Sequence, residues 1–195
     1  MRKSGVSSLL WQGKGDPSRR WLVFSWAVLL AYRALKPFLG QQKAILLLQA
    51  VLSGRFRKQT QTYMDTRFGI SQERPEEAFE RISQNYKTRG ESVFGSRFTY
   101  VQAVQDQRRS HTHITGCLFN DFFRAHGAPE VTRLFCALDT VWVEELHQPR
   151  YKARFERPTT LAAGDDACRF QFSRADSETQ TDAQGPTSPP AAESS

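Results

Sequence analysis

The sequence predicts an α+β fold, in which N-terminal helices pack on an antiparallel sheet of about four strands. Apolar residues recur at helical spacing through roughly the first 90 residues. After that point β-branched and aromatic residues alternate with polar ones, which is typical of half-buried strands. Two further helical segments lie among the strand segments, so we expect two helices inserted between the hairpins of the sheet.

The length and composition predict one hydrophobic core, because 195 residues with 39% apolar and 12% aromatic residues suffice for a single domain. We place this domain at residues 19–173, with a helical part at 19–90 and an α+β part at 91–173. Residues 1–18 are rich in Gly, Ser and Lys and are expected to form a flexible arm. Residues 174–195 are expected to form a disordered tail, because they bury too little apolar surface to offset the entropy of ordering.

Three helices are expected in the N-terminal part of the chain. The first spans about residues 21–38 and should stop near Pro37, since the residue before a proline is disfavoured in the α region. The second spans about residues 41–67. The third should begin at Pro75, a favoured first helical residue, and end at Gly90 in a left-handed cap. We assign no chemistry to these helices.

Strand and helix patterns alternate in the rest of the chain. A strand from Phe98 and a second from about Arg109 to Gly116 should form a hairpin across Gln105–Gln107. The segments that follow are, in order, a helix at 118–126 ended by Gly127, a helix from Pro129 with an apolar stripe, a strand around 151–155, a turn at 164–166 and a returning strand at 168–172.

The N-terminal part is basic and contains one apolar run, so membrane contact has to be considered. The run lies between Arg20 and Arg33 and has about twelve residues, short of the ~20 needed to cross a bilayer. No small-residue cleavage site follows it. Residues 1–70 hold 12 of the 27 Lys and Arg but only 2 of the 20 Asp and Glu. We expect a buried helix without stable membrane insertion, with peripheral binding to anionic lipid as the alternative.

All three cysteines, Cys117, Cys136 and Cys168, lie within residues 111–172. An odd number of cysteines without secretory features predicts free thiols in a reducing compartment, and hence a cytoplasmic protein. Cys117 is expected in the first turn of a helix capped by Thr115, where backbone amides and the helix dipole lower the pKa of a thiol. The alternative is that Cys117 is a small buried hydrophobic residue.

The other two cysteines are expected to face the same interior region as one acid. Cys136 and Asp139 are three residues apart on a predicted helix and therefore share a face. Cys168 shares a strand face with Phe170 and Phe172, so its side chain should point inward. Three thiols near one carboxylate would line a pocket, provided that the hairpin packs on the two inserted helices.

The histidines indicate a metal site only weakly. His111 and His113 alternate on one strand face and His126 ends the next helix, but closed metal sites usually show paired ligands at tight spacing. These side chains are surface or general-base candidates instead. The sequence predicts no cofactor and leaves a metal site open. It contains no Gly-rich phosphate loop, nucleophile-elbow serine or nucleic-acid motif, so no nucleic acid partner is predicted.

Four pieces of the chain's last third resemble the L-2-amino-thiazoline-4-carboxylic acid hydrolase family. They are Cys117, Gly-Ala-Pro-Glu at 127–130, Phe-Cys-Ala-Leu-Asp at 135–139 and Thr-Thr-Leu-Ala-Ala-Gly-Asp-Asp-Ala-Cys-Arg-Phe at 159–170. The resemblance implies a hydrolase that opens a small carboxylated heterocycle, the cyclic amidine 2-amino-thiazoline-4-carboxylate, on the way to cysteine.

The resemblance also implies candidate site residues. The catalytic candidates are Cys117, Cys136, Asp139, Asp165 and Cys168, and the substrate-binding candidates are Glu130, Thr160, Gly164 and Asp166. Arg169 stands where the family commonly has an acid, which bears on the exact substrate. The alternative function is a non-catalytic sensor-like domain that binds a small ligand or a metal in the same pocket. No oligomeric state follows from the sequence.

Overall fold

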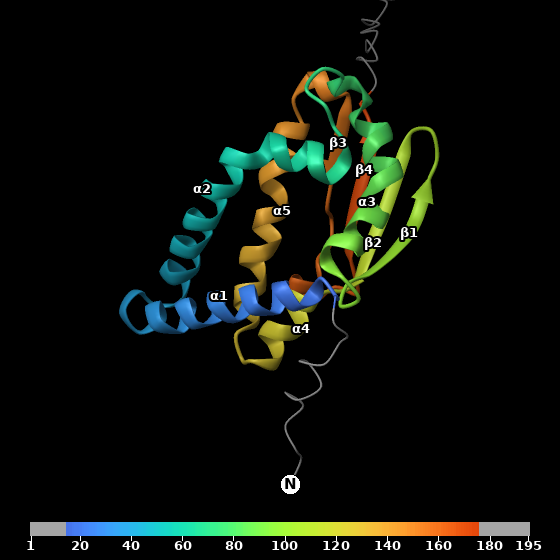
Figure 1. The fold of residues 1–195 in the computed structure, drawn as a ribbon. Coiled ribbons are helices and arrows are strands. Elements are labelled where there is room, and N and C mark those ends of the chain that lie inside the picture. Colours follow the sequence, from blue (N-terminus) through green and yellow to red (C-terminus); the bar gives the residue numbers. More distant parts are fainter. Residues whose placement is uncertain (1–14, 176–195) are drawn as a thin grey trace, which may run out of the picture.

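A computed structural model describes residues 15–175 and shows helices packed on one side of a sheet (Figure 1). Within these residues it contains the α-helices α1 (Ser18–Leu39), α2 (Gln41–Phe68), α3 (Ala78–Phe94), α4 (Leu118–Ala125) and α5 (Thr132–Leu146), and the strands β1 (Thr99–Gln105), β2 (Arg109–Gly116), β3 (Ala153–Glu156) and β4 (Cys168–Arg174). Short 3-10 helices precede α3, α5, β3 and β4, namely η2 (Pro75–Glu77), η3 (Pro129–Val131), η4 (Pro149–Tyr151) and η5 (Leu161–Ala163). The predicted α+β class is confirmed.

The four strands form one antiparallel sheet in the order β1-β2-β4-β3. The helices α4 and α5 are inserted between β2 and β3, as the sequence predicts. Opposite residues of an antiparallel pair share a face, and β2 pairs with β4 so that Thr112 lies opposite Phe170 and Ile114 opposite Cys168. These four residues are buried, which identifies the face of the sheet that meets the helices.

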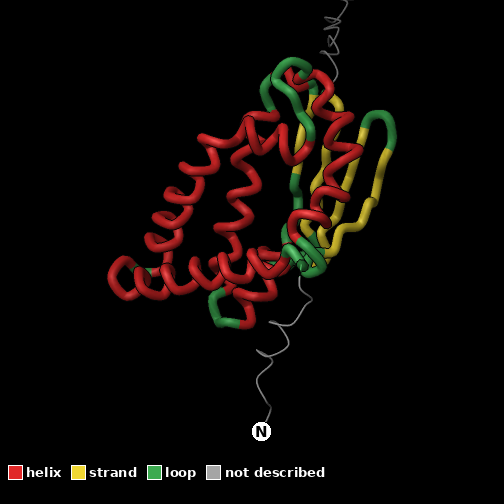
Figure 2. The backbone as a smooth tube through the Cα atoms, viewed as in Figure 1, coloured by secondary structure: helices red, strands yellow, loops and turns green. Residues whose placement is uncertain are grey.

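The helical layer covers that face and then extends beyond it. α3 lies along the sheet, α5 lies between α2 and the sheet, and α1 joins α2 at an end remote from the strands (Figure 2). Aromatic contacts connect the layers, with ring centroids 4.7 Å apart between Phe68 of α2 and Trp142 of α5, and 4.9 Å apart between Tyr86 of α3 and Phe172 of β4. One continuous core therefore joins both layers.

The first helix is longer than the sequence predicts. α1 continues through Pro37 to Leu39. Pro37 lies in the last turn, where the missing N–H removes a single helical hydrogen bond, so the helix tolerates it. Gly40 closes the helix, with a φ of 75° and its N–H donating to the Lys36 carbonyl at 2.9 Å. The helix thus ends one residue past the expected end near residue 38, although Pro37 itself does not stop it.

Gly90 does not cap the third helix, which continues to Phe94 and ends at Gly95 with a φ of 78°. A Cβ at position 90 would lie 2.7 Å from the Tyr100 ring, so glycine is needed there for close packing of α3 on β1. The α+β part consequently starts later than residue 91, because the first strand begins at Thr99.

The domain limits fall close to the ends of the described residues. Most of the expected arm (1–18) and of the expected tail (174–195) lies outside residues 15–175, although Ser18 begins α1 and Arg174 ends β4. α1 is long and apolar enough to cross a membrane, and it is the one such helix among the described residues. The twelve-residue run is therefore part of a 22-residue helix, and its length does not by itself argue against a span.

Candidate active site

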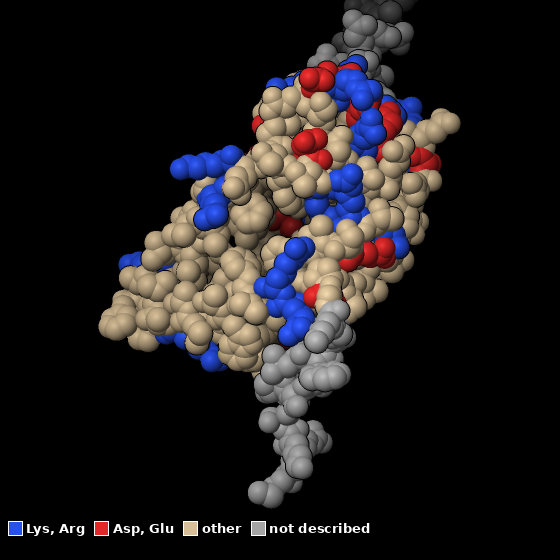
Figure 3. Space-filling view, in the orientation of Figure 1, with Lys and Arg blue, Asp and Glu red and all other residues tan. Residues whose placement is uncertain are grey.

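A cavity of about 200 Å³ lies at the centre of the molecule, between the helical layer and the sheet. Figure 3 shows a hollow on this face with acidic atoms at its floor and Lys or Arg atoms beside it. Pockets for drug-sized ligands usually measure ~300–1,000 Å³, so this cavity suits a smaller molecule. Its wall is mostly apolar and aromatic, with Trp21, Phe24, Phe56, Tyr63, Tyr86, Phe94, Phe98, Tyr100, Phe119, Phe135, Trp142 and Phe170 among the lining residues.

The structure brings four of the nine predicted site residues to this cavity. They are Cys117, Cys136, Asp139 and Cys168. α5 presents Cys136 and Asp139 on one face, as their spacing predicts, while Leu134 on another face is fully buried in the core. The expected pocket of three thiols beside one carboxylate is therefore present.

Arg157, in the connection after β3, binds both the Asp139 carboxylate and the backbone of Cys136. Its Nη1 donates to Oδ2 of Asp139 at 3.4 Å, and its Nη2 donates to the Cys136 carbonyl at 3.1 Å. The guanidinium also lies 5.5 Å from the centroid of the Phe170 ring. These contacts tie α5 to the β3–β4 connection and fix the orientation of the carboxylate.

Burial raises the pKa of Asp139 to about 6, against the lowering effects of the Arg157 and Arg67 guanidinium groups. The side chain lies deep in the protein, yet 42% of its surface remains accessible because it faces the cavity. A carboxyl that titrates near neutral pH and faces a ligand-sized space is suited to general acid–base chemistry.

Burial also raises the pKa of the Cys136 and Cys168 thiols, but for a thiol this rise disfavours the reactive, charged form. It raises the pKa of Cys136 to about 12, and the negative charge of Asp139 adds to this effect. Burial also raises the pKa of Cys168, although the Leu161 amide, which donates to its sulfur at 3.3 Å, opposes the rise. Both groups are therefore thiols rather than nucleophilic thiolates at neutral pH.

Cys117 does not have the activated environment that the sequence predicts. It is the residue before α4, in extended conformation, and Thr115 belongs to β2 rather than capping the helix. Burial raises the pKa of Cys117 well above its usual range, although the amides of Phe119 and Asn120 at the start of α4 oppose the rise. The predicted lowering of this pKa is wrong because desolvation exceeds the effect of the helix terminus.

The other candidates from the 159–170 segment, namely Thr160, Gly164, Asp165 and Asp166, lie in the β3–β4 connection and do not line the cavity. Asp165 accepts a hydrogen bond from the Thr160 amide at 2.9 Å, and Gly164 adopts a left-handed φ of 103°. Asp166 forms an ion pair with Arg169 at 2.9 Å. Asp165 and Thr160 thus contact each other within the loop, and Asp166 pairs with the start of β4. The Leu161 amide of the same loop donates to the Cys168 sulfur.

Glu130 also lies away from the cavity wall. It lies in η3, just before α5, where it accepts a hydrogen bond from the Tyr32 hydroxyl and pairs with Lys36 at 3.5 Å. Both partners are on α1, so Glu130 joins α1 to the α4–α5 connection. Arg169, noted for its charge, donates to the Thr159 hydroxyl at 2.9 Å in addition to pairing with Asp166.

The histidines are separate from the cavity. His111 and His113 pair opposite Gln171 and Arg169, on the face of the sheet away from the helices. His126 packs against Trp26, with ring centroids 4.6 Å apart. Within residues 15–175 no group of three or more His, Cys, Asp and Glu side chains could hold a metal ion.

Sequence reasoning missed two arginines in the cavity wall, Arg67 and Arg157. Arg67 follows Tyr63 by four residues and sits between the buried Met64 and Phe68. A charged residue on the buried face of a helix was the available signal, but the basic composition of the whole helix concealed it. Arg157 follows a strand of ordinary composition and carries no such signal.

Comparison with known families places the chain in one of them. A family model described as L-2-amino-thiazoline-4-carboxylic acid hydrolase matches residues 21–172, well over half of the chain. The chain belongs to this hydrolase family. The match runs from α1 into β4 and so covers both layers of the fold, including α2 with Arg67, which the motif resemblance did not reach. No curated protein and no solved structure matches significantly.

Proposed function

We propose that the protein hydrolyses a small cyclic amidine that carries a carboxylate, such as L-2-amino-thiazoline-4-carboxylate, and that the central cavity is its active site. The observation that carries the proposal is Asp139, a carboxyl with a pKa near 6 on the wall of a cavity of about 200 Å³. The family description supplies the substrate class. A cavity of this size supports a single small heterocycle as the substrate.

In the proposed reaction a water molecule adds to the amidine carbon while the Asp139 carboxylate accepts its proton. The tetrahedral carbon then releases one ring atom, sulfur or nitrogen, which takes the proton back from Asp139. One water molecule is consumed and the ring opens to a carbamoyl-cysteine, which links the reaction to cysteine formation. Arg157 keeps the carboxylate in place through its hydrogen bond to Oδ2.

The raised pKa values of the three thiols favour water, rather than a cysteine, as the nucleophile. We assign the thiols to the wall around the substrate ring. An attack by Cys136 would first require transfer of its proton to Asp139, and with a thiol pKa of about 12 against about 6 that transfer is unfavourable.

The test is direct incubation of the purified protein with 2-amino-thiazoline-4-carboxylate, followed by mass spectrometry of the products. We expect carbamoyl-cysteine from the wild type and about 10²–10⁴-fold slower formation by Asp139→Asn, the range for loss of a general acid–base group. The fragmentation pattern separates the S- from the N-carbamoyl isomer and so identifies the broken bond. No product from folded wild-type protein would rule out this substrate.

A second candidate is a non-catalytic domain that binds a small ligand in the same cavity. It is favoured by one observation, namely that Asp139 is the only carboxyl among the described residues that line the cavity. Binding of the heterocycle without ring opening would support this function. Elemental analysis of protein purified without chelators tests for a metal; about one equivalent, lost on replacing Cys136 and Cys168, would support a metal-binding domain.

The three free thiols further support a cytoplasmic location, which cell fractionation can test.

A further inference from the structure

Arg67, in the last turn of α2, has hydrogen-bonding capacity that the protein itself does not use. The residue lines the cavity and is only 6% exposed. Its Nε and Nη1 atoms are buried and have no hydrogen-bond partner among the described residues. Buried guanidinium donors without partners are costly, so they are rare unless a ligand binds them.

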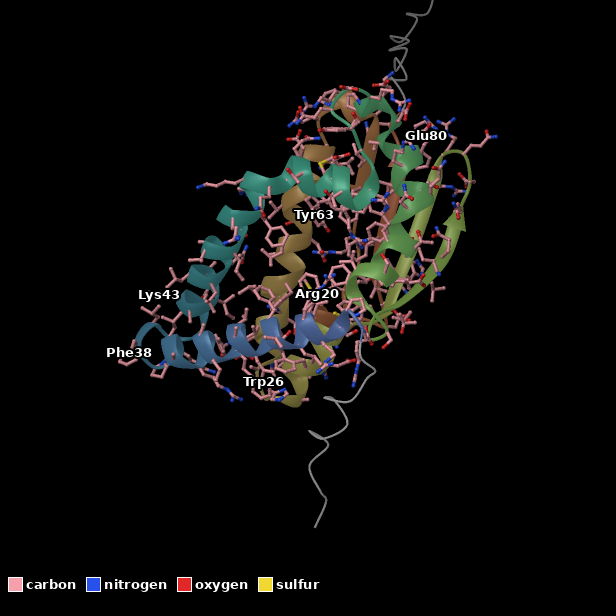
Figure 4. The ribbon with its side chains drawn as sticks, viewed as in Figure 1. Arg20, Trp26, Phe38, Lys43, Tyr63 and Glu80 are labelled. Atoms are coloured by element: carbon pink, nitrogen blue, oxygen red, sulfur yellow. The ribbon has the colours of Figure 1, made fainter. Side chains whose placement is uncertain are left out.

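The surroundings of Arg67 hold the side chain in place without satisfying its charge. Its guanidinium carbon lies 5.5 Å from the centroid of the Phe68 ring and 5.4 Å from that of Phe94. Tyr63, one turn earlier on α2, points toward α5 across the same space (Figure 4). Aromatic faces attract a cation but accept no N–H bond in the plane of the guanidinium, so these contacts leave the Nε and Nη1 donors unpaired beside the cavity that Arg67 lines.

The charges on the cavity wall are not balanced. The described lining contains two guanidinium groups, Arg67 and Arg157, but one carboxyl, Asp139. Asp139 is already paired with Arg157. One positive charge therefore remains without a counter-charge in a mostly apolar cavity, where electrostatic attraction is stronger than in water.

We propose that Arg67 binds the carboxylate of a small monoanionic ligand and thereby turns the rest of the ligand toward Asp139. The free Nε and the free Nη1 each lie beside Nη2 on the planar guanidinium, so either pair can present two adjacent N–H groups to the two oxygens of a carboxylate, which a lysine cannot reproduce. The identity of the ring rests on the proposed hydrolase function, whereas the anion site rests on Arg67 alone. Arg67 is then the residue that selects carboxylated heterocycles over neutral ones.

The binding test uses two probes that differ in charge, thiazole-4-carboxylate and thiazole-4-carboxamide, measured by calorimetry. We expect the wild type to bind the carboxylate at least about tenfold more tightly than the amide, because the amide leaves the guanidinium charge unpaired. Arg67→Met should weaken carboxylate binding about ten- to hundredfold, and Arg67→Lys should have an intermediate effect. Arg57→Met is the matched control, since Arg57 is an exposed arginine on the same helix, paired with Glu144 outside the cavity.

A thermal melt of each variant shows whether it is folded. Ligand-free Arg67→Met should melt at or above the wild-type temperature, because it removes an unpaired buried charge. If that variant does not fold, Arg67→Lys takes its place in the comparison. Equal binding of carboxylate by Arg67→Met and wild type, equal binding of both probes by wild type, or no binding of the carboxylate by wild type would each overturn the proposal.

Kinetics with the amidine substrate distinguish the failure of this proposal from the failure of the hydrolase proposal. Carboxylate binding that depends on Arg67, without ring opening, supports the anion site and contradicts hydrolysis. Ring opening at wild-type KM by Arg67→Met supports hydrolysis and contradicts the anion site. If both proposals hold, Arg67→Met raises KM more than it lowers kcat, because the lost contact is to a part of the substrate that does not react.

Discussion

At the scale of single residues, burial affects the Asp139 carboxyl and the neighbouring thiols in the same direction but with opposite chemical consequences. Both kinds of group lose hydration of their charged form, so the pKa of each rises. The pKa of Asp139 reaches about 6, so this carboxyl readily exchanges a proton near neutral pH. The pKa of Cys136 reaches about 12, so little thiolate is present at neutral pH. Asp139 is therefore the group in the cavity best able to transfer a proton.

If Asp139 acts as the base, kcat/KM should follow its ionised fraction. We expect kcat/KM to rise about tenfold per pH unit below pH 6 and to level off above it, since the base form is required for attack by water. The measurement is kcat/KM for ring opening between about pH 4.5 and 8, with product detected by mass spectrometry. A flat profile across this range would show that another group takes the proton.

The same raised pKa predicts how stability depends on pH. The folded protein binds the Asp139 proton more tightly than the unfolded chain, whose carboxyl has the ordinary value of 3.8. The charged carboxylate therefore lowers the stability of the folded state above pH 6, and this effect disappears as the pH falls toward 3.8. Asp139→Asn should stabilise the protein at pH 8 by no more than about 1 kcal/mol, because water in the cavity screens the charge. Denaturant titrations at several pH values would reveal the effect, and a gain that grows as the pH falls would contradict it.

Cys168 provides a test of the proposed role of the thiols. The family resemblance implies a catalytic cysteine, whereas the raised pKa and the hydrogen bond from the Leu161 amide indicate a residue of the cavity wall. We expect Cys168→Ala to lose about 1–2 kcal/mol of stability and to keep turnover within about tenfold of the wild type. The measurements are a denaturation curve and the rate per folded molecule. A stably folded Cys168→Ala protein without activity would identify Cys168 as a catalytic residue.

At the scale of elements, two helical glycines differ in what surrounds them and therefore in how they should respond to alanine. A Cβ at position 90 would lie 2.7 Å from the Tyr100 ring, whereas a Cβ at position 54, in the middle of α2, meets nothing within 4 Å. Gly90→Ala should cost about 1–3 kcal/mol by overpacking, and Gly54→Ala should gain about 0.5–1 kcal/mol from helix propensity. Chemical denaturation measures both changes. Equal effects at the two positions would show that α3 and β1 are not in the close contact described.

Periodicity predicted the elements well where a regular pattern fills the whole segment. The β2 strand spans Arg109–Gly116 as expected, and α5 places Cys136 and Asp139 on one face. The first helix also ends within one residue of its expected end, but the reason given for that end was wrong because Pro37 lies inside the last turn. The expected cap at Gly90 was wrong because this glycine packs against the Tyr100 ring of a distant strand. Whether a proline lies in a last turn, or a ring lies over a glycine, is not written in local sequence.

The site was predictable to a similar extent and for similar reasons. The cysteine and acid spacing indicated which groups share a face, but their pKa values depend on desolvation by residues far apart in the chain. The segment 159–170 indicated a functional loop, whereas Thr160 and Asp165 bond to each other there and the Leu161 amide donates to the Cys168 sulfur. Tertiary packing, which brings α2 against α5, placed Arg67 in the cavity.

At the scale of the whole molecule, charge and apolar surface coincide on the two helices farthest from the sheet. The sequence contains no Asp or Glu between Ser18 and Met64. Phe38, at the α1–α2 connection, is 88% exposed and points away from the protein (Figure 4). The other large hydrophobic side chains exposed on these helices are Val23, Leu30, Leu39, Leu46, Leu47 and Val51. An apolar tip on a basic helix pair is the combination that binds reversibly to anionic lipid.

We therefore expect the protein to sediment with liposomes that contain phosphatidylserine, and to be released as salt screens the attraction between surface charges. Phe38→Asp with Lys43→Glu should reduce binding about tenfold or more, because it places two negative charges at the exposed tip. Arg109→Glu, a change of the same sign on the sheet, is the control and should have little effect. The cavity is remote from this tip, so ring opening should be unchanged in the double variant. Failure to sediment with anionic liposomes at low salt, together with concentration-dependent dimerisation that Phe38→Asp abolishes, would instead assign this surface to a second copy of the chain.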